Sequence, residues 1–69
     1  MDLYKFSGNN ITPIYLWGDS DDQAQLYCDI LNLDRSINQY QWSVEDDQET
    51  LTRNDGEGTL FDTLQNINT

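Results

Sequence analysis

The alternation of apolar and polar positions predicts that the chain opens with a two-stranded hairpin. Residues 1–6 alternate loosely, and residues 11–17 are mostly β-branched and aromatic, so each segment favours a strand. The composition of residues 7–10 is typical of the turn between them. Pro13 has no backbone N–H, so the second strand is expected to have either a free side or a bulge there.

A helix is predicted over about residues 21–33, because both of its ends carry recognisable signals. Ser20 and Gln23 have the spacing of a capping box, in which each side chain bonds the other residue's backbone N–H. Acidic side chains crowd the same end, where the helix dipole favours negative charge. At the other end, Asn32 and residues 34–36 supply stop signals.

The apolar residues of this helix fall on two stripes. The first stripe has the spacing of a core face and consists of Ala24, Tyr27, Cys28 and Leu31. The second stripe lies on another side and consists of Leu26, Ile30 and Leu33. One sheet face needs only the first stripe. The second is therefore expected to be covered by the C-terminal segment, or to be the surface that binds a partner or a second copy.

Residues 37–46 alternate clearly and predict a third strand. One of its faces is apolar and should pack on the helix: Tyr40, Trp42 and Val44. The other face is polar and should meet water: Gln39, Gln41, Ser43 and Glu45. This alternation indicates an antiparallel sheet that is covered on one side only.

The C-terminal third leaves two structures open. Turn signals at residues 46–48 and 54–58 flank residues 49–53, which favour a short strand. Residues 59–64 either return as its hairpin partner or form a short helix, and residues 65–69 are expected to fray. The expected fold is a single α+β domain over the whole chain, in the order β-β-α-β. One helix packs on an antiparallel sheet of three to five strands, followed by the hairpin or the short helix.

The charge balance narrows the choice of partner. Thirteen acidic and three basic residues give the 69-residue chain a net charge of −10. Such a surface repels nucleic acid and anionic membranes and favours a basic protein surface, for a monomer or a homodimer alike. No stretch approaches the ~20 apolar residues of a membrane span, and the first residues do not resemble a signal peptide. A cytoplasmic location is therefore expected.

The residue types argue against catalysis. There is no histidine, no glycine-rich phosphate loop and no dinucleotide-binding fingerprint, and so small a domain has little concave surface. The single cysteine, Cys28, lies on the predicted core face and is expected to be a buried thiol. The acidic runs at residues 19–22 and 45–47 lack the spacing of a calcium loop. We therefore expect no enzyme, no catalytic residue, no metal site and no cofactor.

Acidic residues are nevertheless concentrated in one segment. Six carboxylates occur between residues 45 and 57, where Arg53 is the only basic residue, and two more lie on one side of the helix. Spaced carboxylates can imitate a nucleic-acid backbone, which carries a charge every ~3.4 Å along each strand. The acidic positions are thus either a solvated face or a protein-binding surface made of Asp22, Asp29, Glu45, Asp46, Asp47, Glu49, Asp55 and Glu57.

A small, acidic chain without catalytic residues resembles the inhibitors that bacteriophages make against host machinery. One such group is the anti-CRISPR proteins, several of which are short α+β domains and some of which mimic DNA. Residues 13–15 (Pro-Ile-Tyr) followed by residues 22–24 (Asp-Gln-Ala) are also similar to the strand-to-helix segment of the phage T7 inhibitor of bacterial RNA polymerase. That similarity ends after the helix, where this chain is acidic rather than basic, so it assigns no binding residue.

The resemblance to phage inhibitors implies a non-enzymatic protein that binds a basic, nucleic-acid-handling host protein and blocks its nucleic-acid binding. An anti-CRISPR protein acting partly as a DNA mimic is the leading hypothesis, and an inhibitor of bacterial RNA polymerase is the alternative within this class. A hypothesis from another class is a small structural or assembly protein that dimerises through the second helix stripe.

Overall fold

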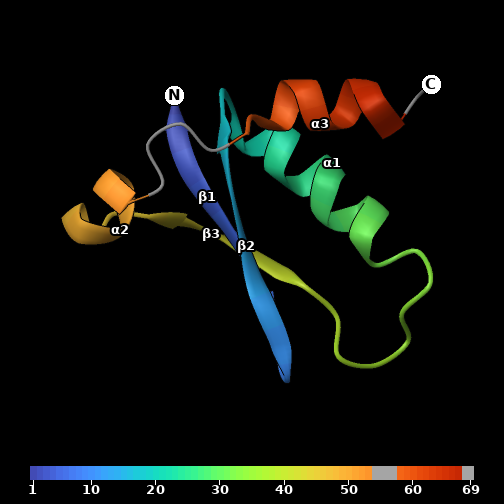
Figure 1. The fold of residues 1–69 in the computed structure, drawn as a ribbon. Helices are drawn as coiled ribbons and strands as arrows, with labels where there is room; N and C mark the ends of the chain where they lie inside the picture. Colours follow the sequence, from blue (N-terminus) through green and yellow to red (C-terminus); the bar gives the residue numbers. More distant parts are fainter. Residues whose placement is uncertain (54–57, 68–69) are drawn as a thin grey trace.

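The computed structural model describes residues 1–53 and 58–67, which form an α+β fold with a three-stranded antiparallel sheet (Figure 1). The elements in chain order are β1 (Asp2–Gly8), β2 (Ile11–Gly18), α1 (Asp21–Leu31), β3 (Gln41–Glu45), α2 (Gln48–Arg53) and α3 (Leu60–Ile67). The strand order is β2-β1-β3, so the first strand of the chain is the central one. The predicted hairpin, helix and third strand are present, although the third strand begins at Gln41 and ends at Glu45 rather than covering residues 37–46. The described residues contain no further strand.

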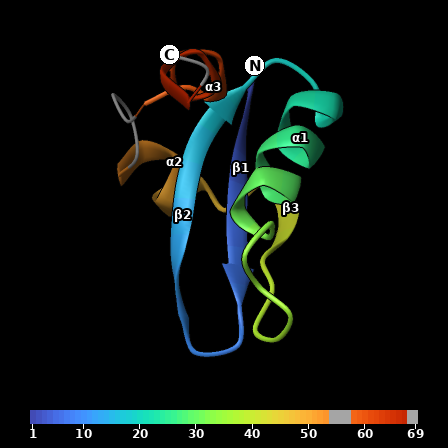
Figure 2. The same ribbon diagram turned by 90° about the vertical axis from the view of Figure 1, so that its right-hand side faces the viewer.

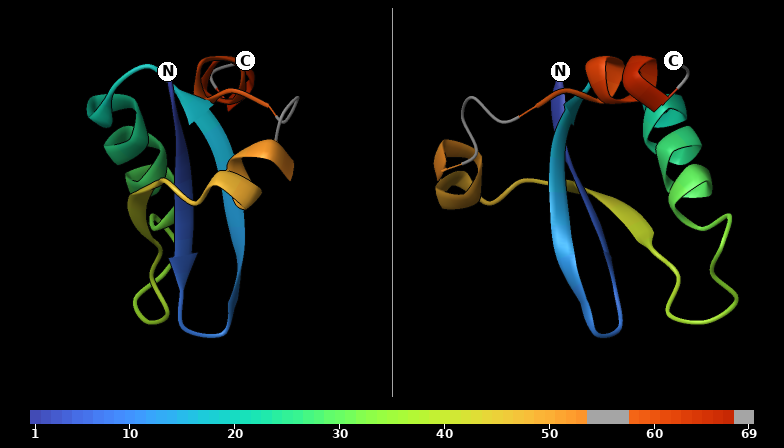
Figure 3. Two further views of the ribbon diagram at one scale, coloured as in Figure 1. Left: turned by 90° about the vertical axis from the view of Figure 1, so that its left-hand side faces the viewer. Right: turned by 45° about the vertical axis from the view of Figure 1, so that its right-hand side comes forward.

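One face of the central strand is buried along its length, and the other is buried only at Leu3. Leu3 and Tyr4 are neighbours in β1 and therefore point to opposite faces, yet both are buried, with 1% of each side chain exposed. Figure 1 shows α1 and α3 to the right of the sheet and α2 to its left, and Figure 2 and the left view of Figure 3 agree. The sheet is covered mainly on one side, as predicted, because Gln41 and Ser43 are exposed on the second face and Leu3 is the buried residue of β1 there.

The hydrophobic core lies between the sheet and the helices α1 and α3. Phe6 packs edge-on against Tyr27, with ring centroids 5.0 Å apart, and Tyr4 packs edge-on against Trp42 at 5.7 Å. Such aromatic pairs add about 0.5–1.5 kcal/mol to the effect of burial alone. The core consists of Tyr4, Phe6, Ala24, Tyr27, Cys28 and Leu60. The core stripe predicted for the helix is confirmed, since Leu31 also packs against this cluster.

The third strand is less buried than its alternation predicts. Tyr40 and Trp42 pack against the core but are only partly buried, and 46% of Val44 is exposed. The reason is the position of β3 at the edge of the sheet, where a side chain has a neighbouring strand on one side only. The prediction that Val44 is buried against the helix is therefore wrong.

The ends of α1 follow the capping signals with small changes. The Ser20 hydroxyl accepts a hydrogen bond from the Gln23 N–H at 3.3 Å, and the Gln23 side chain accepts from the Asp19 N–H at 2.8 Å. The predicted box is thus shifted by one residue on its second bond. The helix ends at Leu31, two residues earlier than predicted, and Asn32 is its C-cap.

The β1–β2 hairpin contains the irregularity that Pro13 requires. The strand register shifts between Phe6 and Gly8, and the residues facing this shift in β2 include Pro13. Asn10 in the turn has a φ of 59°, a left-handed conformation that asparagine tolerates better than most residues. The predicted alternative of a bulge is therefore consistent with the observed register.

The C-terminal third is helical. The Asp47 carboxylate caps α2, because it accepts hydrogen bonds from both the backbone N–H (3.1 Å) and the hydroxyl (2.8 Å) of Thr50. Residues 49–53 are therefore helical, and the predicted strand there is wrong. In the same way, the Thr59 hydroxyl accepts from the Asp62 N–H at 3.1 Å at the start of α3. Of the two structures left open for residues 59–64, the helix is correct. It continues to Ile67 through residues that were expected to fray.

The second stripe of α1 is not covered as expected. Leu26 and Leu33 are 51% and 78% exposed, and only Ile30 is partly buried. The C-terminal helix instead directs Leu60 and Leu64 into the core. The stripe therefore remains an apolar surface on the described structure.

The docking of α3 can be tested by comparing two neighbouring positions. Leu60→Ala should destabilise the protein by about 2–5 kcal/mol, because Leu60 is fully buried. Phe61→Ala should cost less than about 1 kcal/mol, because 54% of Phe61 is exposed. Urea unfolding followed by tryptophan fluorescence measures both, and a larger loss for Phe61→Ala than for Leu60→Ala would contradict the packing.

Candidate binding surface

The register of the sheet brings acidic residues from several segments to one end. Asp2 begins β1 and lies opposite Gly18, the last residue of β2, while Leu3 lies opposite Glu45, the last residue of β3. The loops that leave β2 and β3 therefore start at the same end of the sheet, on either side of β1. A bridge between Trp17 and Thr59 brings the start of α3 to the same place.

We call this region the acidic end. Its carboxylates come from the strand ends and from the first turns of all three helices, and they are Asp2, Asp19, Asp21, Asp22, Glu45, Asp46, Asp47, Glu49 and Asp62. All of them are exposed except Glu45, which is partly buried. The short segments that supply them contain no basic residue. Arg53 lies in the last turn of α2, so negative charge predominates at this end without being uniform.

One of these carboxylates connects the acidic end to the core. The buried Tyr4 hydroxyl donates a 2.8 Å hydrogen bond to Asp21 Oδ1 in the first turn of α1. Burial of the ring, this hydrogen bond and the charges of Asp21, Asp2 and Asp19 together raise the pKa of Tyr4 from 10.0 to about 12. Asp21 thus lies beside the end of β1, where Asp2 is opposite Gly18, the residue before Asp19.

Two further carboxylates organise the loop after β3. Glu45 Oε1 accepts from the Asp47 N–H at 3.1 Å, and the Asp47 side chain caps α2 through Thr50. Asp46 lies between them and is exposed. The loop is therefore held by its acidic residues, and Asp46 is presented outward.

Carboxylates also line the side of α1 above β3. Gln25 connects the two elements, because its Oε1 accepts from Trp42 Nε1 at 2.9 Å and its Nε2 donates to Asp29 Oδ1 at 2.8 Å. Asp22 lies three residues before Gln25, on the same side of the helix. Asp22 and Asp29 are exposed, so this flank of α1 extends the negative surface away from the acidic end.

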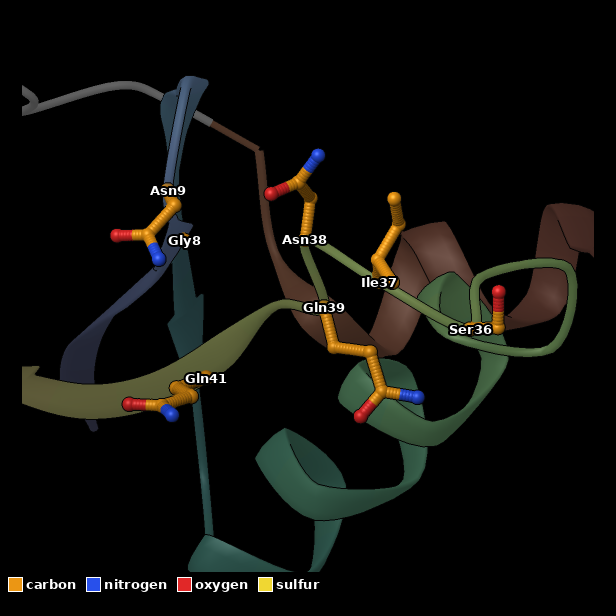
Figure 4. A pocket seen from close by; sticks show the side chains of 7 residues that line it. All are labelled: Gly8, Asn9, Ser36, Ile37, Asn38, Gln39 and Gln41. Atoms are coloured by element: carbon orange, nitrogen blue, oxygen red, sulfur yellow. The ribbon is translucent and has the colours of Figure 1, made fainter.

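The opposite end of the sheet is polar and nearly uncharged. A hollow of about 270 Å³ lies there, lined by Gly8, Asn9, Ser36, Ile37, Asn38, Gln39 and Gln41, and Figure 4 shows the amide side chains around it. Arg35 in the adjoining loop donates to the Asn38 carbonyl (3.1 Å) and lies over the Tyr40 ring, 4.9 Å from its centroid. The molecule is therefore electrically asymmetric along the sheet.

A second hollow of about 280 Å³ separates α1 from β3 and is lined by Gln25, Cys28, Asn32, Tyr40, Gln41 and Trp42. Cys28 is the only thiol, and burial raises its pKa. Its thiol donates a hydrogen bond to the Tyr40 carbonyl oxygen, 3.3 Å from Sγ. The predicted buried thiol is confirmed, and neither hollow places a general base beside a nucleophile. The described residues contain no group of three acidic or thiol side chains that could hold a metal ion.

The structure brings together most, but not all, of the predicted binding residues. Glu45, Asp46, Asp47 and Glu49 lie at the acidic end, although α2 replaces the strand on which they were expected to continue, and Asp22 and Asp29 lie on one flank of α1. The predicted Asp55 and Glu57 lie outside the described residues. Sequence reasoning missed Asp2, Asp19, Asp21 and Asp62, because only the register and the Trp17–Thr59 bridge show that they are neighbours.

The Tyr4–Asp21 bond predicts how stability depends on alkaline pH. Because the folded-state pKa of Tyr4 is raised, its contribution to stability is complete below pH 10 and is lost as the pH rises to about 12. Tyr4→Phe should therefore lower stability at pH 7 and make the loss between pH 10 and 12 less steep. Stability should still fall with rising pH in this variant, but less steeply, because burial also raises the pKa of Tyr27. Urea midpoints measured across this range provide the test, and an unchanged slope in Tyr4→Phe would contradict the assignment.

No helix in the described part of the chain has the length and apolar character needed to cross a membrane. Comparisons with protein-family models, with curated proteins and with solved structures found no match. The surface chemistry is therefore the basis for assigning a function.

Proposed function

We propose that this chain is a non-enzymatic inhibitor that binds a basic, nucleic-acid-handling protein in a host cytoplasm and blocks its nucleic-acid binding. The type that fits best is an anti-CRISPR protein acting partly as a DNA mimic, and an inhibitor of bacterial RNA polymerase is the alternative. One observation carries this proposal: carboxylates from separate segments lie at the same end of the sheet, where they outnumber the basic residues Lys5 and Arg53 of β1 and α2.

The acidic end has the physical properties that such binding needs. Hydrogen bonds hold the carboxylates of Asp21, Glu45 and Asp47 in place, so these side chains lose little conformational entropy on binding. A predominantly negative surface also accelerates association with a basic groove, by about 10–10³-fold. Once the acidic end occupies the groove, nucleic acid is excluded from it.

A second candidate function is supported by the exposed stripe on α1. Leu26 on α1 and Leu33 just after its C-cap present apolar surface to solvent, as they would in a structural protein that dimerises through this side of the helix. The two functions respond differently to salt. Binding through charge weakens steeply as salt rises, whereas apolar association does not.

Neutralising part of the acidic end should abolish most of the binding without unfolding the protein. In the quadruple variant Glu45→Gln, Asp46→Asn, Asp47→Asn and Glu49→Gln, an asparagine at position 47 can still cap α2. Affinity for the basic proteins that the parent chain captures from a bacterial lysate should fall at least about tenfold, with a shallower salt dependence. Excess duplex DNA should release the captured proteins from the parent.

Two single variants control for net charge. Asp46→Asn and Asp34→Asn each remove one exposed carboxylate, but only Asp46 belongs to the acidic end. Asp46→Asn should weaken binding more than Asp34→Asn does. Equal effects of the two variants, or captured proteins that DNA does not release, would show that this end is not a nucleic-acid mimic.

A further inference from the structure

In the edge strand β3, the backbone N–H and C=O groups of Trp42 and Val44 point away from the sheet. The Trp17 N–H donates to the Gly58 carbonyl at 3.1 Å, so the backbone of Trp17 faces away from β1. Backbone groups in an antiparallel ladder alternate between the two sides of a strand, so Leu3, opposite Trp17, must direct its own groups toward β3. Its partner there is Glu45.

The alternation along β3 then follows from this pair. Glu45 faces β1, so Val44 and Trp42 direct their N–H and C=O groups away from the sheet. The backbone N–H and C=O of Tyr40 have the same outward orientation, and both form hydrogen bonds with one side chain. The Asn32 side chain accepts from the Tyr40 N–H at 2.8 Å and donates to the Tyr40 carbonyl at 3.0 Å. The Asn32 side chain thus makes the two hydrogen bonds to Tyr40 that the backbone of a neighbouring strand would make.

The next positions along the edge have no neighbouring strand in the described part of the chain, because β3 is the outer strand of the sheet. Val44 is 46% exposed there, and the hollow of about 280 Å³ between α1 and β3 opens beside Trp42. Outward backbone groups, an exposed β-branched side chain and an adjoining hollow are the features that strand addition uses.

The charge around this edge determines the partner. Asp22 and Asp29 line the flank of α1 above β3, and Glu45 and Asp46 end the strand. A second copy of the chain would bring the same carboxylates against these, and each copy carries a net charge of −10. An extended segment with lysine or arginine at alternate positions would instead pair with them.

We infer that the open edge of β3 binds an extended, basic segment of a partner protein by strand addition, with the partner's backbone bonded to Trp42 and Val44. This inference rests on the proposed function in one respect, namely that the partner is basic. It adds the mode of binding: backbone hydrogen bonds supply affinity, while Asp22 and Asp29 select for positive side chains.

Amide hydrogen exchange measured by NMR tests this pairing directly. The probe is a capped hexapeptide of alternating lysine and valine. Its addition should slow exchange at the Trp42 and Val44 amides, and leave the Ser43 and Glu45 amides, which already bond to β1, unchanged. The same peptide with N-methyl groups on alternate residues should not bind, because its bonding edge is blocked. A version with glutamate in place of lysine should not bind either.

Two variants complete the test. Val44→Pro removes an outward N–H without removing a hydrogen bond to β1, and should lower the affinity for the peptide about tenfold. Val44→Ala keeps the N–H and should bind within about threefold of the parent. If Val44→Pro does not fold, the N-methylated peptide decides alone.

Several results would overturn strand addition. These are no binding of the peptide, equal binding of its N-methylated form, or protection of Trp42 and Val44 by self-association without peptide. The proposed function is judged separately, by DNA release of captured proteins and by the acidic-end variants. If the unmodified and N-methylated peptides bind equally and DNA still releases the captured proteins, strand addition is refuted and the proposed function stands.

Discussion

The fold depends on burying a central strand that carries a phenol. Because β1 lies between two strands, and α1 and α3 pack over the face that carries Tyr4, this side chain is buried and its hydroxyl needs a partner inside the protein. That partner is Asp21, so the first turn of α1 is held at the end of β1. A buried hydroxyl without such a bond costs about 1–3 kcal/mol. The same bond therefore orients the helix and fixes a carboxylate at the edge of the core.

The pairing that builds the core also creates the charged surface. Antiparallel strands of matched register end together, and each strand end here carries or precedes acidic residues. Mutual repulsion of these groups is tolerated because they are exposed to solvent, where interactions between charges are weak and screened by salt. The proposed function uses this arrangement, since a basic groove would relieve the repulsion on binding.

The sequence predicted what local patterns encode and missed what depends on distant contacts. The capping residues at Ser20 and Gln23 and the alternation of residues 40–44 were sufficient to locate α1 and β3. The helix α2 was missed because the role of Asp47 as a cap competes with the strand preference of residues 49–53. The central position of β1, the exposure of Val44 and the neighbourhood of Asp2 follow from strand order and register, which no local pattern in this chain specifies.

The most direct test of the central claim is an NMR footprint of this chain bound to a purified protein captured by it. The account predicts that backbone amide signals change at Asp2, at residues 19–22 and at residues 45–49, while those around the amide-lined hollow at Asn9 and Asn38 do not. A footprint confined to Leu26 and Leu33, or to that hollow, would contradict the claim that the converging strand ends form the binding surface.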